Sequence, residues 1–181
     1  KTQQGMTDDI DELEKLVQEM LNYTAMEVQL PEMNMTEIPL HELSQHVLDQ
    51  LDPSLVSNKQ LSIEGAPLTI TADAHYLERA ILNLVGNACR YADEQIRIVT
   101  AAYPNGVEIR VEDDGPGIDS KYTEKVFEPF FRPDESRVRI RGGAGLGLAI
   151  VKRIIDWHEG ECLLTRSELG GACFTIRLPT D

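Results

Sequence analysis

The stretch GGAGLGLAIV, from Gly142 to Val151, places four glycines within six residues and then continues as an apolar run. Glycine is costly in regular structure, so such a cluster marks a backbone that bends sharply or closely approaches another group. Two well-known nucleotide motifs do not fit. The dinucleotide motif G-x-G-x-x-G requires a glycine where Leu148 stands, and the phosphate loop G-x-x-x-x-G-K-[ST] requires a lysine there. Another kind of nucleotide site and a purely structural turn remain as alternatives.

The charge of the chain restricts its partners. The 181 residues include 17 basic and 31 acidic side chains, which gives a net charge of −14. This balance argues against nucleic acid or an anionic membrane surface as a partner. A phosphate ligand would have to be held by local cations, a metal ion or backbone N–H groups. Cys89, Cys162 and Cys173 show no C-x-x-C spacing, which favours ordinary thiols in a reducing, cytoplasmic compartment over a metal site.

Length and composition predict one globular domain with a short appendage. The hydrophobic content of 41% is enough for a core. No run in the sequence approaches the roughly 18 apolar residues that a membrane span requires, and the first residues do not resemble a signal segment. The sequence starts at Lys1 rather than at a methionine, so we expect a piece of a longer protein.

The first thirty residues are predicted to form a separate helix. Thr7, followed by several acidic residues, predicts a capped helix start. The apolar residues of this helix form only a narrow stripe, which favours packing against a partner helix. The alternative is that the helix folds back on its own domain. We therefore divide the chain into residues 1–30 and 31–181. The stripe follows alternating steps of four and three, the spacing of a helical bundle: Met6, Ile10, Leu13, Val17, Met20 and Thr24.

Beyond Pro31, the pattern alternates between helices and strands. Apolar residues at helical spacing predict helices over 40–51, 74–92 and 147–158, the second of them capped by Asp73. A linker that ends in a short edge strand is expected over 31–39, and short strands over 61–65, 68–72, 161–166 and 172–178. Residues 95–113 predict a hairpin that turns across Pro104, Asn105 and Gly106. This order indicates a layer of helices on a mixed, largely antiparallel sheet, an α/β fold.

Two asparagines stand four residues apart in the long predicted helix. Asn83 and Asn87 therefore project from the same face, with Arg90 and Tyr91 one turn further on. The neighbouring residues are apolar, so we expect both amides to border a cavity. Their oxygens suit a hard cation such as Mg²⁺, and the alternative is that both amides are hydrogen-bonded to nearby backbone.

Two further stretches carry chemistry. In VEDDGPGI, a strand ends at an acid pair followed by two glycines, so a carboxylate could accept a hydrogen bond from a ligand amine, although D-G and P-G also occur in ordinary turns. In VFEPFFRPDESRVRIR, aromatic residues precede arginines, which suit phosphate oxygens. The glycine stretch then opens a helix, whose free N–H groups favour an anion.

The order of these stretches resembles the N, G1, F and G2 boxes of sensor histidine kinases. They are NLVGNACRY, DDGPG, FEPFF and GAGLGL, and the resemblance covers about residues 32–181. It implies the Bergerat ATP-binding fold, a two-layer sandwich of helices on a mixed sheet, preceded here by one bundle-type helix. It also implies ATP and Mg²⁺ as ligands.

The resemblance implies a role for each matching residue. Asn87 would be the Mg²⁺ ligand, supported by Asn83, and Asp113 would accept from the adenine amino group. Arg132 would reach the γ-phosphate, and Asn83, Asn87 and Arg132 would be the catalytic residues. The nucleotide would also contact Arg90, Tyr91, Gly115, Gly117, Ile118, Phe130, Gly143, Gly145, Leu146, Gly147 and Leu148. The lid arginines Arg137, Arg139 and Arg141 would add positive charge.

The phosphoacceptor of the family is missing. None of His41, His46, His75 and His158 stands in an H-E-x-[RK]-x-P context. We therefore expect a kinase fragment that phosphorylates a histidine on a separate dimerisation hairpin, for relay to a response regulator. The longer protein would be a homodimer at the inner membrane, with this domain in the cytosol. The alternatives are a non-catalytic ATP-binding or dimerisation module and a gyrase-like or Hsp90-like ATPase, in which Glu would stand where Asn83 does.

Overall fold

The computed structural model describes residues 3–133 and 145–180, without the side chains of residues 3–9 and 12. The helices are α1 Gln3–Val28, α2 Leu40–Asp49, α3 Pro53–Val56, α4 Ala74–Tyr91 and α5 Gly147–Trp157. The strands are β1 Met35–Pro39, β2 Gln60–Gly65, β3 Thr69–Asp73, β4 Gln95–Tyr103, β5 Gly106–Asp113, β6 Glu161–Arg166 and β7 Ala172–Pro179. Two 3₁₀ turns, η1 Ser120–Tyr122 and η2 Lys125–Phe127, follow β5.

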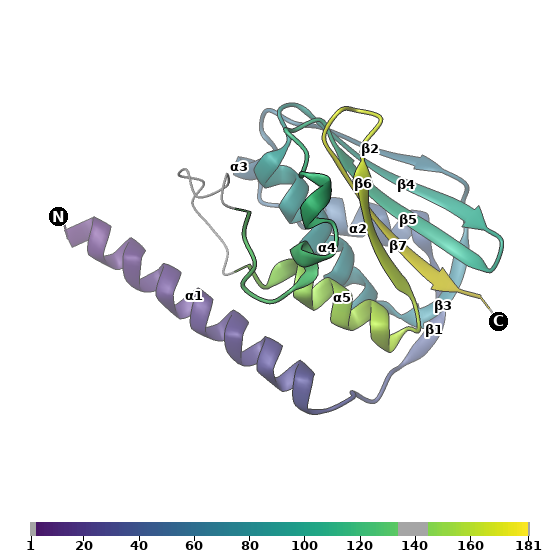
Figure 1. Ribbon diagram of the computed structural model, residues 1–181, viewed down its shortest axis with the longest axis horizontal. Coiled ribbons are helices and arrows are strands. Elements are labelled where there is room, and N and C mark those ends of the chain that lie inside the picture. The colour runs from purple at the N-terminus through teal and green to yellow at the C-terminus, as the bar shows by residue number, and fades with distance from the viewer. Residues whose placement is uncertain (1–2, 134–144, 181) are drawn as a thin grey trace.

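The main sheet has the strand order β2-β4-β5-β7-β6. β2 runs parallel to β4, and the other neighbours are antiparallel. The predicted hairpin turn is present, because Tyr103 pairs with Gly106 across it. β1 and β3 form a separate antiparallel pair. Helices cover one face of the main sheet (Figure 1). The predicted helix layer on a mixed, largely antiparallel sheet is therefore confirmed.

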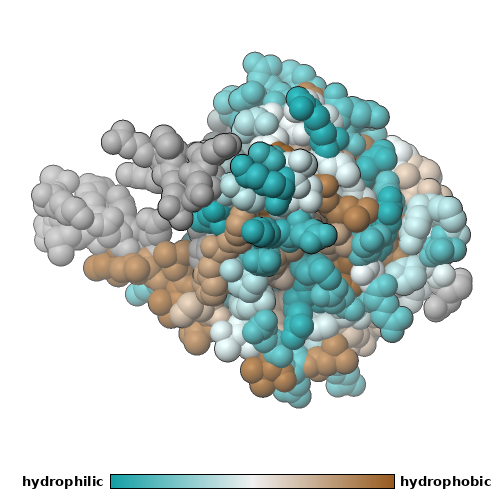
Figure 2. Space-filling model, in the orientation of Figure 1, coloured by the Kyte–Doolittle hydropathy of each residue, from teal (hydrophilic) through white to brown (hydrophobic). Residues whose placement is uncertain are grey.

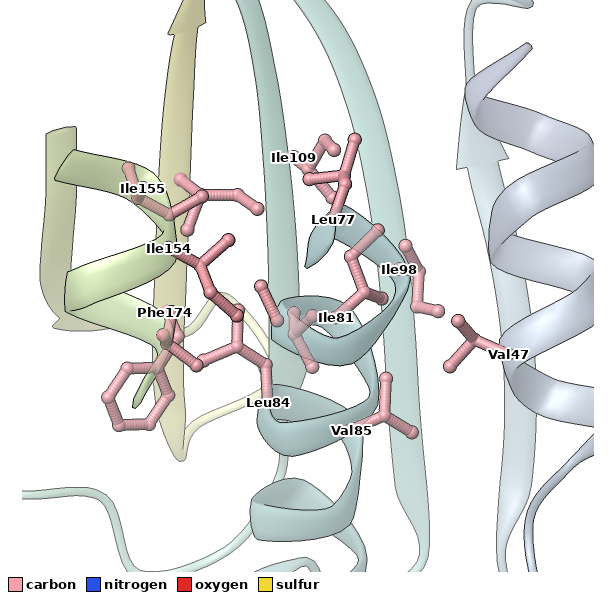
Figure 3. Close-up of a cluster of buried hydrophobic side chains, with 14 of the residues drawn as sticks. Val47, Leu77, Ile81, Leu84, Val85, Ile98, Ile109, Ile154, Ile155 and Phe174 are labelled. Carbon is pink, nitrogen blue, oxygen red and sulfur yellow. The ribbon is translucent and has the colours of Figure 1, made fainter. Parts of the chain in front are cut away.

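The core lies between the sheet and the helices. Figure 3 shows Leu77, Ile81 and Leu84 of α4 beside Ile154 of α5 and Phe174 of β7. Each of these side chains is at most 2% exposed. Complete burial of such a side chain stabilises the fold by about 1.5–3 kcal/mol, so this contact fixes α4 and α5 against the sheet.

A buried histidine joins the ends of α4 and α5. His158 lies at the C-terminal end of α5, where its Nδ1 is 2.7 Å from the carbonyl oxygen of Ile154. Its Nε2 accepts a hydrogen bond of 3.0 Å from the backbone N–H of Asp73. Asp73 caps α4 as predicted, because its Oδ1 accepts from the backbone N–H of Tyr76. This histidine is therefore a structural group.

Helix α1 differs from the prediction in its start, and a face other than the predicted stripe packs on the domain. It already includes Gln3, before the predicted start near Thr7, because glutamine and methionine are good helix formers and the single Gly5 costs only about 1 kcal/mol. The predicted stripe is exposed, with Leu13 60% and Val17 52% accessible, and hydrophobic side chains are visible along α1 in Figure 2. A different face, which includes Tyr23 and Met26, packs on the domain. Within the described ranges, no helix is long and apolar enough to cross a membrane.

Candidate nucleotide site

A cavity of about 650 Å³ is bordered by α4, the start of α5 and the segment after β5. The helical period of α4 separates this cavity from the core, because its opposite face is buried beneath the sheet. The α4 residues that line the cavity are Arg79, Leu82, Asn83, Gly86, Asn87, Arg90 and Tyr91. The predicted residues Asp113, Gly117, Ile118, Arg132, Gly145, Gly147 and Leu148 also line it.

Asp113 is held by two backbone donors. Its Oδ1 accepts hydrogen bonds from the N–H groups of Gly115 at 2.9 Å and Ala172 at 3.1 Å. Its Oδ2 makes no hydrogen bond with the residues that the structure describes, although Asp113 is 2% exposed and borders the cavity. Burial raises the pKa of Asp113, the two N–H groups oppose that rise, and the neighbouring carboxylates Asp114 and Asp93 add to it. One oxygen is thus fixed in place and the other is left for a ligand.

The second acid of the pair has a structural role. Oδ1 of Asp114 accepts hydrogen bonds from the backbone N–H groups of Asp93 at 2.9 Å and Glu94 at 3.1 Å. Burial would raise the pKa of Asp114, but these and other backbone hydrogen bonds hold it below its usual value. Asp114 therefore ties the segment after α4 to the end of β5.

The two asparagine amides differ in their surroundings. Nδ2 of Asn83 donates a hydrogen bond of 2.8 Å to the carbonyl oxygen of Arg79. Its Oδ1 faces the start of α5, where a Cβ built on Gly147 would lie 3.1 Å away. The half-buried amide of Asn87 makes no hydrogen bond with the described residues. No group of three or more His, Cys, Asp or Glu side chains in the described part of the chain could hold a metal ion. On the α4 side of the cavity, the amide oxygens of Asn83 and Asn87 are oxygen donors of the kind that a hard cation prefers.

Four basic and three acidic side chains line this cavity, whereas acidic residues predominate in the chain as a whole. Lys15, Arg79, Arg90 and Arg132 line it, and none of them forms an ion pair with a carboxylate among the described residues. The first turn of α5 adds backbone donors, because no side chain caps it. Uncapped N–H groups at a helix start favour an anion. The cavity is thus suited to phosphate groups.

Several predicted residues do not line the cavity. Gly115 supports Asp113 from behind through its N–H. Leu146 is fully buried in the core. The side chain of Phe130 is 55% exposed, and its N–H donates to the carbonyl oxygen of Gly145 at 3.0 Å. The lid residues Gly143, Arg137, Arg139 and Arg141 lie outside the described residues.

Other lining residues were missing from the prediction. Arg79, Leu82 and Gly86 share the face of Asn83, so their helical spacing could have indicated them. Lys15 and Glu19 reach the cavity from α1, and no sequence pattern indicates that contact. The remaining lining residues are Pro116, Asp119, Tyr122, Val126, Phe131, Pro133, Ile150 and Ala172.

Comparison with known proteins shows which family the chain resembles. Residues 72–181 match the family described as histidine kinase-, DNA gyrase B- and HSP90-like ATPase. The sensor protein RstB of Escherichia coli (strain K12) is 37% identical over 180 residues, which cover 97% of this chain and 41% of RstB. The sensor histidine kinase CpxA of the same strain is 40% identical over 131 residues, which cover 72% of this chain and 28% of CpxA. The chain thus spans less than half of either relative.

Solved structures agree with these matches. Full-length ShkA in complex with AMPPNP has a TM-score of 0.81 at 28% identity, over 97% of this chain and 37% of ShkA. The histidine kinase ThkA in complex with the response regulator protein TrrA has a TM-score of 0.77 at 28% identity, over 97% of this chain and 49% of that one. The resemblance to sensor histidine kinases is confirmed, and the chain belongs to the histidine kinase-, DNA gyrase B- and HSP90-like ATPase family.

Proposed function

We propose that residues 31–181 are the catalytic ATP-binding domain of a sensor histidine kinase, and that residues 1–30 end the second helix of its dimerisation hairpin. The observation that carries the proposal is the layout of the cavity. Asp113 lies at the end of the cavity that is close to Tyr91. A Cβ built on Gly115 would lie 2.3 Å from the carbonyl oxygen of Tyr91 and 3.1 Å from Oδ1 of Asp113. Asn83 lies at the other end, beside the start of α5. The rise along α4 from Tyr91 to Asn83 is about 12 Å.

This layout suits a nucleotide with its base at Asp113 and its phosphates at α5. The free Oδ2 of Asp113 accepts from the exocyclic amine of adenine, and a base lies against Gly117 and Ile118. Mg²⁺, when bound, neutralises phosphate charge, and the amide oxygens of Asn87 and Asn83 hold it. The phosphate oxygens are bound by Arg90, Arg132 and the N–H groups of Gly145, Gly147 and Leu148. Tyr91 lines the nucleotide nearer the base.

The reaction transfers the γ-phosphoryl group of ATP to a histidine outside this sequence. An imidazole nitrogen of the acceptor forms the new bond to phosphorus while the bond to the β-phosphate oxygen breaks, so ADP leaves. The acidic neighbour of the acceptor takes the imidazole proton. Positioning and charge neutralisation supply most of the catalysis in such transfers. Asn83 has no group that could take a proton from water, which disfavours the ATPase alternative.

The test supplies the acceptor in trans. A dimeric, histidine-containing hairpin from the intact protein is mixed with this chain and ATP–Mg²⁺. We expect acid-labile phosphohistidine on the hairpin and one ADP per phosphate. ATP–Mg²⁺ alone should raise the melting temperature, because a ligand at 100 times its Kd stabilises the fold by about 2.7 kcal/mol. Binding without transfer would favour a non-catalytic module, and an unchanged melting temperature at millimolar ATP would refute the nucleotide site.

The exposed stripe of α1 supports a proposal about assembly. Ile10, Leu13, Val17 and Met20 are each about half exposed, which suits a helical bundle in a dimer of the longer protein. We further propose that the longer protein is an inner-membrane sensor that holds this domain in the cytosol and passes the phosphoryl group to a response regulator. The excess of acidic residues gives no support for nucleic acid as a partner.

A further inference from the structure

We propose that Arg79 contacts the γ-phosphoryl group of bound ATP and distinguishes ATP from ADP. The proposal rests on the function proposed above and goes beyond the four sequence motifs, since Arg79 precedes the first of them. Its basis is the state of the Arg79 guanidinium, the place of Arg79 along α4 and its link to Asn83.

The guanidinium of Arg79 has no partner among the residues that the structure describes. Arg79 is half-buried and lines the cavity, yet its side chain makes no ion pair or hydrogen bond with the described residues. The adjacent acid, Glu78, is engaged elsewhere, by Gln50 at 2.7 Å and His46 at 3.7 Å. A half-buried charge is costly without a partner. Because no acidic side chain in the described part of the chain neutralises Arg79, its guanidinium suits an anion that a ligand supplies.

The place of Arg79 along α4 identifies that anion. Arg79, Asn83 and Asn87 are spaced four residues apart, so they form one row in which each step rises about 6 Å. Tyr91 and Asp113 mark the base end of the row. Arg79 stands one turn beyond Asn83 at the opposite end, where the terminal phosphate of a nucleotide would lie.

Arg79 is also mechanically linked to Asn83. The carbonyl oxygen of Arg79 accepts the hydrogen bond from Nδ2 of Asn83 at 2.8 Å. Both residues are thus set by the same turn of α4. This bond orients the amide of Asn83, and Arg79 lines the same cavity one turn away, so its guanidinium can reach a phosphoryl group next to the Asn83 amide.

The chemistry of arginine suits this position. A guanidinium stays protonated and offers several N–H donors in one plane. It can follow the charge that spreads over the phosphoryl oxygens during transfer, and it gives up no proton. ADP has no γ-phosphoryl group, so it should bind equally well with and without Arg79.

The test compares two nucleotides by titration calorimetry. We expect Arg79→Ala to weaken AMPPNP–Mg²⁺ binding by about tenfold or more, as loss of a charge-assisted hydrogen bond does, and to leave the Kd of ADP–Mg²⁺ within about twofold. Arg79→Lys should recover part of the loss. Arg166→Ala removes an exposed arginine of β6 outside the cavity, so it controls for the change in net charge.

The outcomes separate the two proposals. If the parent chain bound neither ADP nor AMPPNP, the nucleotide site itself would be overturned. If Arg79→Ala weakened the binding of both nucleotides equally, or did not weaken the binding of AMPPNP, the role of Arg79 would be overturned and the nucleotide site would stand. Retained ADP binding in the variant also shows that it is folded.

Discussion

The backbone N–H of Ala172 donates a hydrogen bond of 3.1 Å to Oδ1 of Asp113, which joins the first residue of β7 to the last residue of β5. The N–H of Gly115 donates to the same oxygen. Because both donors belong to the main chain, the carboxylate is oriented before any ligand arrives. Orientation in advance reduces the entropy that binding would otherwise cost.

The first prediction concerns Asp113→Asn. The amide oxygen can keep both backbone hydrogen bonds, but an NH₂ group replaces the free oxygen and cannot accept from adenine. We expect ATP affinity to fall by about tenfold or more, the effect of one lost hydrogen bond to a charged group. Isothermal titration measures this, and equal affinity in variant and parent would refute the role of Asp113.

The same variant should not lose stability at neutral pH. The pKa of Asp113 is raised by burial, so the folded chain holds this proton more tightly than the unfolded chain. Stability therefore falls as pH rises from the unfolded pKa, about 3.9, through the raised folded pKa. Asp113→Asn removes this loss, so its free energy of unfolding at pH 7 should equal or exceed that of the parent. The difference should shrink toward pH 4 in urea titrations, and a difference that grows there would contradict the prediction.

Gly171→Ala should disturb Asp113, which is distant from Gly171 in sequence but adjacent to it in space. A Cβ built on Gly171 would lie 2.1 Å from Oδ1 of Asp113 and 2.5 Å from the backbone nitrogen of Gly115. The strand or the carboxylate must shift, and overpacking of this kind costs about 1–3 kcal/mol. We expect both a lower free energy of unfolding and weaker ATP binding. Unchanged values of both would show that the turn after β5 is more adaptable than its contacts indicate.

Most of the fold could be predicted because its helices and strands follow regular patterns. The period of α4 separates Leu77 and Ile81 from Asn83, and the turn at Gly106 indicates the hairpin. Patterns do not show which distant elements meet. The separate pairing of β1 with β3, and the contact of Lys15 and Glu19 with the cavity, depend on tertiary packing alone.

The site shows the same division. The motifs contain the groups with specific chemistry, such as the carboxylate of Asp113 and the amide of Asn87. They do not reveal that Leu146 turns into the core, because a leucine at a helix start suits either side. They also leave out Arg79, which we propose for the site because its guanidinium has no acidic partner in the described part of the chain.

Gly86→Ala should stabilise the free chain. Gly86 lies in the middle of α4, and a Cβ built there would meet no atom within 4 Å. Replacing a glycine within a helix by alanine gains up to about 1 kcal/mol. Urea unfolding measures the gain, and Gly171→Ala is the matched control, because the same methyl group meets a crowded site there. A loss of stability in Gly86→Ala would mean that α4 needs glycine for its curvature.

Arg153→Ala should release the end of α1. Arg153, on α5, donates from Nε to the carbonyl oxygen of Met26 at 3.2 Å and from Nη2 to that of Glu27 at 3.1 Å. These carbonyls belong to the last turn of α1, which has no basic residue of its own, and a cation there offsets the negative helix end. Removal should cost about 1 kcal/mol locally, since the contact is partly exposed.

Hydrogen exchange resolved by peptide fragments tests this change. Amides of residues 24–30 should exchange about fivefold faster in Arg153→Ala, while those of β5 and β7 keep the rates of the parent. Lys152→Ala is the control, because Lys152 is adjacent on α5 and pairs with Asp156 on the surface. Faster exchange in both variants would point to a general loosening of α5. Unchanged exchange in Arg153→Ala would show that Tyr23 and Met26, packed on the core, hold α1 without the arginine.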